Sequence, residues 1–339
     1  MLRFVALLCV IGFVAACDRP LAMIELAGPT MGTAYSVKVV AAPPTVDRRT
    51  VQETIDAVLA DIDRQMSAYR PDSEISRFNA AATTEWFPIS DGFAVVVETA
   101  QRVSEQSAGA MDITVAPLVN LWGMGPPGEL KAVPDEAVID SVRQRVGYRN
   151  LEVRRAPAAL RKRVAELTID VNAVAPGFAV DLLASKLAAL GIENFMIDIG
   201  GEVRARGRNA RGEKWRIAIE RPLDDEPTPY AIAQLEDAAI TTSGEYRHYT
   251  MLDGRRYSHT IDPRTGRPVE HRLASVVVVQ PTALEADAWA TALNVLGENE
   301  GYALVERLQI PAFFIVDEGD AWVHRMTPAF SPHLAQPLP

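Results

Sequence analysis

The chain has 339 residues, of which 48% are hydrophobic, and a formal net charge of −10. This length and composition allow a large core, and the two cysteines, Cys9 and Cys17, cannot supply a disulfide framework. The acidic balance and the absence of a basic run argue against a nucleic-acid partner, because such binding depends on clustered Lys and Arg.

The first 20 residues have the pattern of a secretory signal, with a basic start at Arg3 and an apolar run from Phe4 to Val14. The run is much shorter than the ~20 residues that a helix needs to span a bilayer. Small residues precede a cysteine in Val14-Ala15-Ala16-Cys17, which resembles a lipobox. The simpler alternative is ordinary cleavage near Ala16 with an incidental cysteine.

The lipobox makes Cys17 the lipidated first residue of the mature protein. Asp18 follows it and resembles the signal that keeps bacterial lipoproteins on the inner membrane. We therefore expect a protein anchored by lipid to the periplasmic face of that membrane. The expected divisions are a signal peptide over 1–16, a lipid-anchored linker over 17–24, a folded domain over 25–325 and a C-terminal tail over 326–339.

Two periodicities divide the rest of the chain into strands and helices. Alternating apolar residues predict strands, and apolar residues three or four apart predict helices. In chain order, the expected elements are a strand at 35–39, helices at 51–66, about 90–107 and 134–146, a strand at 167–171, a helix at 177–190, strands at 195–199 and 275–280, a helix at 283–296 and a strand at 311–316.

Glycines and turn residues set the expected ends of these elements. Gly147, Gly191 and Gly297 stand where three of the helices should end. Hairpins are expected to turn near 209–212 and at Asp253-Gly254. Because no repeat or low-complexity linker is present, we predict an α+β fold: one compact body of mixed sheets with packed helices. Two closely fused lobes would also fit the length.

Asp287 and Thr291 are candidate metal ligands. They lie four residues apart in a predicted helix, so their oxygens fall on one face. Two hard oxygen ligands suit magnesium, which also tends to contact substrate phosphate. An Asp and a Thr at this spacing are also common on an ordinary exposed helix face.

A second candidate site is the segment from Thr168 to Gly177. Its polar residues alternate with apolar ones along the predicted strand, and the chain then enters a helix with Pro176 near the first turn. Free backbone N–H groups at a helix start favour phosphate or another anion. A plain capped helix would give the same pattern.

Two further segments carry polar residues in suggestive places. Asp112 stands among apolar residues in Gly109-Ala110-Met111-Asp112-Ile113-Thr114, where it can also simply cap a turn. His259 lies at the end of a predicted hairpin strand with Asp262 three residues on, after the run Thr242-Ser243-Gly244-Glu245-Tyr246. A general base with a nearby carboxylate is one interpretation of His259, and a structural histidine is the other.

Together these segments resemble the ApbE family, the FAD:protein FMN transferases. The similarity runs in chain order from about Glu25 to Val316. Its motifs are Met31-Gly32-Thr33, Met66-Ser67-Ala68-Tyr69, Ser73-Glu74-Ile75-Ser76 with Asn79, Gly109 to Thr114, Asp170 to Asp181, Asp198 to Glu202, Thr242 to Tyr246, Tyr257 to Gly266, and Ala286-Asp287-Ala288 with Ala290-Thr291-Ala292-Leu293.

The resemblance assigns roles to particular residues. It implies that Asp287 and Thr291, with the backbone oxygen of Ala173, bind Mg²⁺, and that His259 is the base. Pro176 departs from the family pattern, which commonly has a Lys or another polar residue at that position of the FAD site. The positions implied to contact FAD are Met31, Tyr69, Ala110, Met111, Asp112, Asp170, Pro176 and Ile261.

The reaction implied by the resemblance is phosphoryl transfer. A Thr or Ser hydroxyl of an acceptor protein attacks the FMN phosphorus of FAD, the substrate, and AMP departs. The acceptors implied are flavoprotein subunits of membrane redox complexes, such as Rnf-type or sodium-pumping (Nqr-type) complexes, or reductases related to nitrous oxide respiration. Two alternatives remain: a metal-dependent FAD pyrophosphatase that gives FMN and AMP, and a lipoprotein that binds FAD without chemistry.

Overall fold

The computed structural model describes residues 21–335, apart from 126, 127, 129, 223–227, 245–248 and 253. The predicted signal peptide and the lipidation site Cys17 lie outside these residues. Within the described part, none of the helices is both long enough and apolar enough to cross a bilayer.

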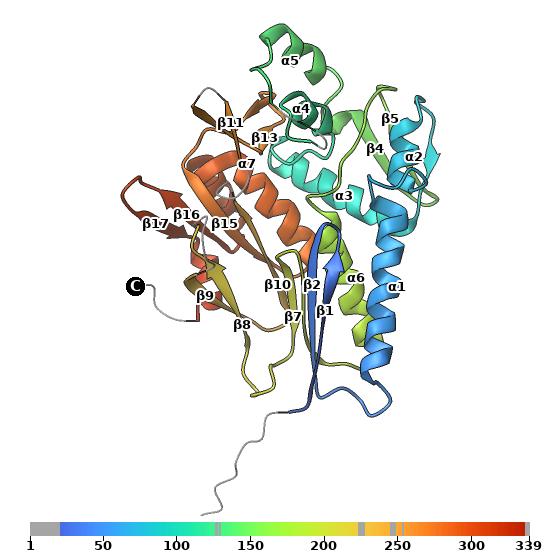
Figure 1. The fold of residues 1–339 in the computed structure, drawn as a ribbon, viewed down its shortest axis with the longest axis vertical. Coiled ribbons are helices and arrows are strands. Elements are labelled where there is room, and N and C mark those ends of the chain that lie inside the picture. Colours follow the sequence, from blue (N-terminus) through green and yellow to red (C-terminus); the bar gives the residue numbers. More distant parts are fainter. Residues whose placement is uncertain are drawn as a thin grey trace, which may run out of the picture.

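An eight-stranded sheet runs through the described part of the chain, and each strand is antiparallel to its neighbours (Figure 1). Alternate residues along these strands point to opposite faces, so the sheet can bury both. In spatial order, the strands are β1 (Met23–Thr30), β2 (Thr33–Val40), β6 (Asn194–Ile199), β7 (Glu202–Arg206), β10 (Ala238–Gly244), β15 (Leu273–Gln280), β16 (Ala312–Asp317) and β17 (Trp322–Met326).

Three long helices cover one face of this sheet: α1 (Arg48–Met66), α6 (Ala175–Ala189) and α7 (Ala283–Leu308). α6 packs between α1 and α7, and α7 lies against β10 and β15. The apolar stripe of α1, which includes Val51, Ile55 and Ile62, packs with Val37 and Val39 of β2. The amphipathic spacing in the sequence is therefore the surface that docks these helices on the sheet.

The opposite face is covered by a two-stranded sheet, β8 (Trp215–Glu220) and β9 (Pro229–Leu235), and by the 3₁₀ helix η2 (Pro328–His333). Phe330 of η2 is fully buried there, next to Phe313 of β16. The segment predicted as a C-terminal tail therefore packs on the body as far as 335. At the other end, β1 begins at Met23, inside the predicted linker.

Smaller elements lie above one end of the sheet (Figure 1). α3 packs against α7, and Trp122, just after α4, lies in a small core with α5. The remaining elements are α2 (Glu74–Ala80), β3 (Phe87–Pro88), α3 (Asp91–Gln106), α4 (Ala116–Leu121), α5 (Glu136–Arg143), η1 (Tyr148–Asn150), β4 (Leu151–Arg155), β5 (Ala158–Lys162), β11 (Tyr249–Leu252), β12 (Arg255–Ser258), β13 (Ile261–Asp262) and β14 (Arg267–Pro268).

The predicted strand at 167–171 is wrong, because this segment lies outside every described sheet. The alternation behind the prediction is real, since Leu167, Ile169 and Val171 are all buried. The backbone of Ile169 pairs instead with one side chain: Asn79 accepts from its N–H at 2.9 Å and donates to its carbonyl at 2.8 Å. A single amide thus occupies the place of a partner strand.

The hairpin predicted near 209–212 is also wrong. A turn does form there, with the Gly212 N–H donating to the Asn209 carbonyl at 2.9 Å. The strands on either side belong to different sheets, because β7 pairs with β6 and β10, whereas β8 pairs with β9. The hairpin predicted at Asp253-Gly254 is confirmed by the pairing of Leu252 with Arg255.

Gly191 follows the C-cap of α6 with a φ of 80°, as its sequence position predicts. Gly297 also leaves the helical region, with a φ of 73°, but helix α7 resumes after it and continues to Leu308. The third predicted helix is shorter than expected and covers only Glu136–Arg143.

Candidate active site

The starts of helices α6 and α7 meet and cap each other. The carboxylate of Asp181 in α6 accepts hydrogen bonds from the N–H groups of Ala283 and Leu284, both at 2.9 Å. In return, the carboxylate of Asp287 in α7 accepts from the Gly177 N–H at 3.3 Å. Each helix thus uses a carboxylate of the other to satisfy N–H groups that lack a partner in their own first turn.

Gly177 makes this close meeting possible. A Cβ atom at this position would lie 2.6 Å from the Ala283 carbonyl oxygen and 2.9 Å from the Leu284 nitrogen. Both are backbone atoms that cannot rotate away. Only a glycine therefore allows the two helix starts to approach this closely.

Asp287 is a buried carboxylate with little to compensate its charge. It is 5% exposed, and no Lys or Arg in the described part of the chain pairs with it. Burial raises the pKa of Asp287 well above its usual range, and the carboxylate of Glu202 raises it further. A cation bound here would remove the cost of this charge.

Ala173 offers a second oxygen at the same place. Gly177, four residues later, would donate to the Ala173 carbonyl in a regular helix, but it donates to Asp287 instead. Within the described residues, no hydrogen bond reaches the Ala173 carbonyl. Thr291 stands one turn after Asp287 on α7 and is half-buried. The carboxylate of Asp287, the carbonyl of Ala173 and the hydroxyl of Thr291 are all oxygen ligands of the kind that a hard divalent cation prefers.

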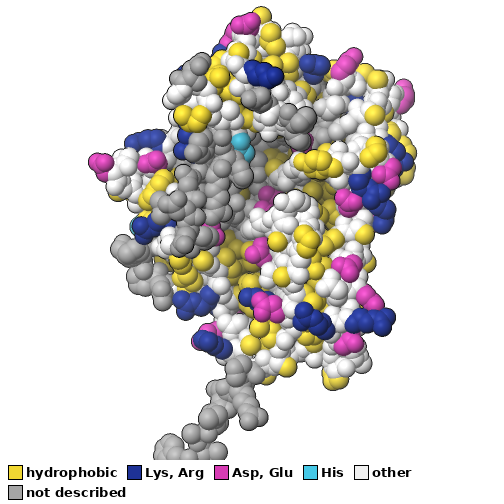
Figure 2. All heavy atoms as spheres, viewed as in Figure 1, with side chains coloured by type: hydrophobic (Ala, Val, Ile, Leu, Met, Phe, Trp, Pro, Cys, Tyr) yellow, Lys and Arg dark blue, Asp and Glu magenta, His cyan; other side chains and the backbone are white. Residues whose placement is uncertain are grey.

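Glu202, at the start of β7, adds to the negative charge beside Asp287. Burial, and then the charge of Asp198, raise the pKa of Glu202 to about 7. Burial also raises the pKa of Asp170 and of Asp181. Asp181 is held by Arg204 as well as by the start of α7. In Figure 2, acidic side chains lie in and beside a hollow near the middle of the face.

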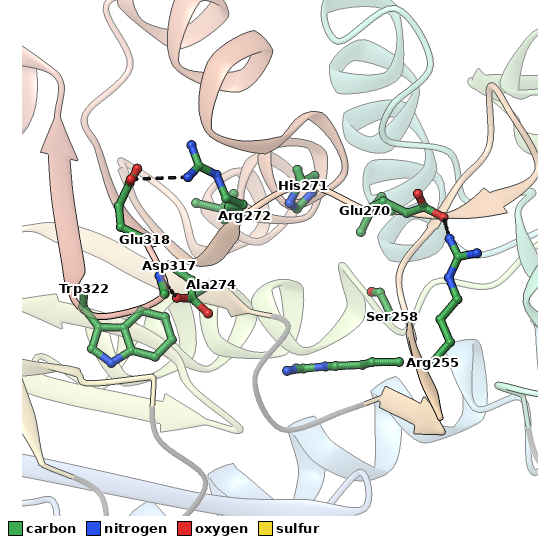
Figure 3. A pocket seen from close by; sticks show the side chains of 13 residues that line it. Arg255, Ser258, Glu270, His271, Arg272, Ala274, Asp317, Glu318 and Trp322 are labelled. Carbon is green, nitrogen blue, oxygen red and sulfur yellow. Dashed lines mark hydrogen bonds and ion pairs between the residues drawn. The ribbon is translucent and has the colours of Figure 1, made fainter. Parts of the chain in front are cut away.

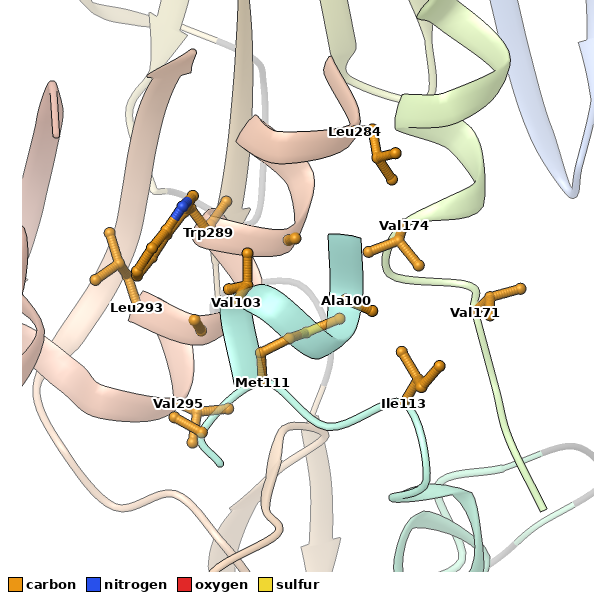
Figure 4. Close-up of a cluster of buried hydrophobic side chains, with 14 of the residues drawn as sticks. Ala100, Val103, Met111, Ile113, Val171, Val174, Leu284, Trp289, Leu293 and Val295 are labelled. Carbon is orange, nitrogen blue, oxygen red and sulfur yellow. The ribbon is translucent and has the colours of Figure 1, made fainter. Parts of the chain in front are cut away.

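The side chains of the segment at 110–112 are buried in the protein. The side chains of Ala110 and Met111 are 1% and 2% exposed, and Figure 4 shows Met111 among Val103 and other core side chains. Any contact of these two residues with a ligand therefore falls to their backbone. The Asp112 carboxylate accepts from Thr114 N–H at 2.8 Å and from Tyr148 N–H at 2.7 Å, so it holds the loop in shape.

The other positions predicted for FAD lie on several different elements. Met31, in the turn between β1 and β2, and Tyr69, after α1, are 40% and 77% exposed and are accessible to a ligand. Ile261 is 4% exposed, and Asp170 accepts from the Asn172 N–H at 2.8 Å. Pro176 lies in the first turn of α6, where the lack of an N–H group costs no helical hydrogen bond.

His259 directly follows β12 and is half-buried. The carboxylate predicted to lie nearby, Asp262, is bound by the guanidinium of Arg264 at 3.0 Å, and Arg264 also pairs with Glu300. Thr260, the next residue, accepts from the Asn294 side chain of α7 at 3.1 Å. The histidine is therefore carried by a segment that α7 holds in place.

A pocket of about 630 Å³ is lined in part by residues of β12. Figure 3 shows Ser258, the neighbour of His259 in the chain, at this pocket, with ion pairs between Arg255 and Glu270 and between Arg272 and Glu318. None of the residues predicted to bind the metal or FAD lines it.

A model of the ApbE family matches residues 31–314. The chain belongs to the ApbE family. Among curated relatives, the FAD:protein FMN transferase of Vibrio cholerae is 42% identical over 322 residues, which are 95% of this chain and 96% of the relative. The FAD:protein FMN transferase of Escherichia coli K12 is 39% identical and matches 91% of this chain and 88% of its own length.

Solved structures of ApbE proteins share the fold. The flavin transferase ApbE of Vibrio cholerae superposes with a TM-score of 0.85 at 42% identity, covering 93% of this chain and all of that one. The apo form of the Pseudomonas stutzeri flavinyl transferase ApbE gives 0.86 at 40% identity, covering 94% and 99%. The predicted α+β fold and the family are therefore confirmed.

Three residues that contribute to the site had no predicted role: Asp181, Glu202 and Gly177. Each belongs to a motif that resembles the family, so the sequence did mark these positions as candidates. The role was not visible because each acts on a distant segment: Asp181 bonds N–H groups more than 100 residues away. Sequence spacing reports only contacts within one element.

Proposed function

We propose that this chain transfers the FMN moiety of FAD to a Thr or Ser hydroxyl of an acceptor protein, in a Mg²⁺-dependent reaction that releases AMP. One observation carries the proposal: among the described residues, the buried carboxylate of Asp287 has no Lys or Arg partner and the Ala173 carbonyl has no donor, and both lie where the starts of α6 and α7 meet. The names of relatives that match over almost the whole chain support the transfer of FMN from FAD to a protein.

Different residues are proposed to bind the metal and FAD. Asp287, Thr291 and the Ala173 carbonyl would hold Mg²⁺, which neutralises charge on the diphosphate of FAD when bound. Met31 and Tyr69 present exposed side chains on which FAD can lie. The N–H groups at the start of α6 already have acceptors, because Ala175 donates to the Val171 carbonyl at 2.8 Å and Gly177 donates to Asp287 at 3.3 Å. Pro176 supplies neither a cation nor an N–H group there, so the metal would carry the contact with the diphosphate.

His259 is proposed as the base that takes the proton of the acceptor hydroxyl. It lies between β12 and Thr260, which α7 holds through Asn294. A base must be within hydrogen-bond reach of the proton it removes, so a fixed segment is the appropriate carrier. With His259→Ala we expect slower transfer and unchanged FAD binding.

The location is also part of the proposal. A protein lipidated at Cys17 and held on the periplasmic face of the inner membrane would meet acceptor subunits of Rnf-type, Nqr-type or nitrous oxide-related redox complexes. Labelling with a radioactive fatty acid tests the anchor. Label is expected on the wild type and not on Cys17→Ser, and an unlabelled wild type would remove the anchor from the proposal.

The central experiment mixes the enzyme with FAD, Mg²⁺ and a panel of candidate acceptor domains. Flavin fluorescence is then sought on the denatured acceptor band. We expect signal with Mg²⁺, no signal with EDTA, and loss of at least about a hundredfold in rate with Asp287→Ala, a range typical for removal of charge stabilisation. Glu285→Gln is the matched control, because Glu285 lies on the same helix and pairs with Arg102 at the surface.

The products separate the alternatives. FMN and AMP formed without labelled acceptor would indicate a pyrophosphatase, since water then replaces the hydroxyl. FAD bound without any Mg²⁺-dependent release of AMP would indicate a binding lipoprotein. Either result across a fair panel of acceptors would refute the transferase.

A further inference from the structure

Residues 167–171 lie outside every described sheet, and different groups hold the two sides of their backbone. On one edge, the Asn79 amide bonds both the N–H and the carbonyl of Ile169, at 2.9 and 2.8 Å. On the other edge, the Asp170 N–H donates to the Ile113 carbonyl at 2.7 Å. Consecutive residues thus point their backbone groups in opposite directions, as they do in a strand.

Asn79 belongs to a helix that is fixed at both ends. At the start of α2, the Ser73 hydroxyl caps Ser76 N–H at 3.1 Å and donates to the Ser67 carbonyl at 2.7 Å. At the other end, the buried ammonium of Lys162 donates to the carbonyls of Asn79 at 3.3 Å and Ala81 at 2.9 Å. The amide of Asn79 therefore has a fixed position from which to hold another segment.

The segment that Asn79 holds leads directly into the site. Asp170 follows Ile169, and the Ala173 carbonyl lies four residues after Ile169, just before α6. The opposite edge is held by Ile113, next to Asp112. Asn79 thus ties α2 to the approach to α6, and the backbone of Asp170 joins that approach to the loop at 110–114.

We propose that Asn79 is a positioning residue for FAD. Its amide sets the register of residues 169–173, so that Asp170 and the Ala173 carbonyl face the bound FAD and its metal. This inference rests on the proposed function, which assigns those two residues to FAD and Mg²⁺. Asn79 would act through Ile169, which both polar atoms of its amide bind.

Removal of the amide should shift the segment rather than unfold it. Ile169 is 2% exposed, so its N–H and carbonyl would lose their partners in a buried place and the backbone would move to regain them. The loop at 110–114 and α2 keep their other hydrogen bonds. The expected result is weaker binding of FAD, with near-normal reaction once FAD is bound.

The test measures the Kd of FAD by equilibrium dialysis with Mg²⁺ and, separately, kcat at saturating FAD. For Asn79→Ala we expect the Kd to rise by about tenfold, as for loss of one or two hydrogen bonds, with kcat within about twofold of the wild type. Asn79→Asp keeps the acceptor for the Ile169 N–H and loses the donor, so its Kd should fall between those of the wild type and the alanine variant.

Thr327→Val is the matched control. Thr327 is also buried, and its hydroxyl accepts from the Ala312 N–H at 3.0 Å and donates to the Ile310 carbonyl at 2.9 Å, beside β16 and η2. Its loss should lower the melting temperature and leave the Kd of FAD unchanged.

An unchanged Kd in Asn79→Ala would overturn the inference, and so would an equal rise in Thr327→Val, since that rise would come from general destabilisation. If Asn79→Ala does not fold, Asn79→Asp decides: a Kd equal to that of the wild type refutes the role. A wild type that binds FAD but labels no acceptor would refute the proposed reaction and leave this dialysis test intact.

Discussion

The buried charge of Asp287 lowers the stability of the metal-free protein and provides a ligand for a cation. A buried carboxylate normally has a cationic partner, yet the described contacts give Asp287 only the Gly177 N–H at 3.3 Å. Its own burial and the neighbouring Glu202 both oppose its charge. The folded protein without metal therefore carries a local cost that a bound cation would relieve.

We predict that Asp287→Asn stabilises the metal-free protein. The amide keeps an oxygen for the Gly177 N–H and removes the buried charge, so the free energy of unfolding should rise by about 1–3 kcal/mol. Thermal unfolding in EDTA and in Mg²⁺ tests this. Mg²⁺ should raise the melting temperature of the wild type and not of the variant; a less stable variant, or one that still responds to Mg²⁺, would contradict the prediction.

The same charge gives a pH dependence of known sign. The pKa values of Asp287 and Glu202 are raised in the folded state, Glu202 to about 7, so folding favours their protonated forms. This contribution is complete below the unfolded pKa and is lost as the pH rises through the folded one. In EDTA, the melting temperature should fall between about pH 4.5 and 7, and less so in Asp287→Asn.

At the scale of elements, the paired starts of α6 and α7 are the central feature. Gly177→Ala should push them apart, because the added Cβ would lie 2.6 Å from the Ala283 carbonyl oxygen. We predict a loss of about 1–3 kcal/mol in stability and weaker Mg²⁺ binding, measured by denaturant unfolding and isothermal titration.

Gly301→Ala is the control for this substitution. Gly301 lies in the second part of α7, and a Cβ there would come no nearer than 3.3 Å, to a side-chain atom of Leu293. Alanine favours a helix over glycine, so this variant should be neutral or more stable. If both variants behaved alike, the close approach at Gly177 would have no special role.

The elements differ in how well the sequence predicts them. α1 and α3 were predictable because their apolar stripes and N-caps are local signals, and the end of α6 was predictable from the glycine that follows it. The segment 167–171 was not, because its partner is a side chain 90 residues away that no periodicity reports. The pair Asp287 and Thr291 was visible from helical spacing, whereas the capping by Asp181 depends on tertiary contact.

At the scale of the whole molecule, the C-terminal segment completes the core. Phe330 is fully buried against Phe313 and the strands β8 and β9. We predict that Phe330→Ala costs about 3–5 kcal/mol, measured by denaturant unfolding, and that ending the chain at 325 costs at least as much. Val323→Ala, at a side chain 48% exposed on β17, should change stability little. A stable protein without 326–339 would contradict this prediction.

Strand β1 also sets a distance between the two ends of its hairpin. Its eight residues rise by about 3.3 Å each, so the turn that bears Met31 lies roughly 26 Å from Met23. A tether attached before Met23 would hold the end of the sheet where β1 begins, while the turn that bears Met31 lies toward the smaller elements (Figure 1). A molecule standing upright on a membrane could then serve only acceptors that project well above the lipid, and one lying on its side could reach those close to the surface.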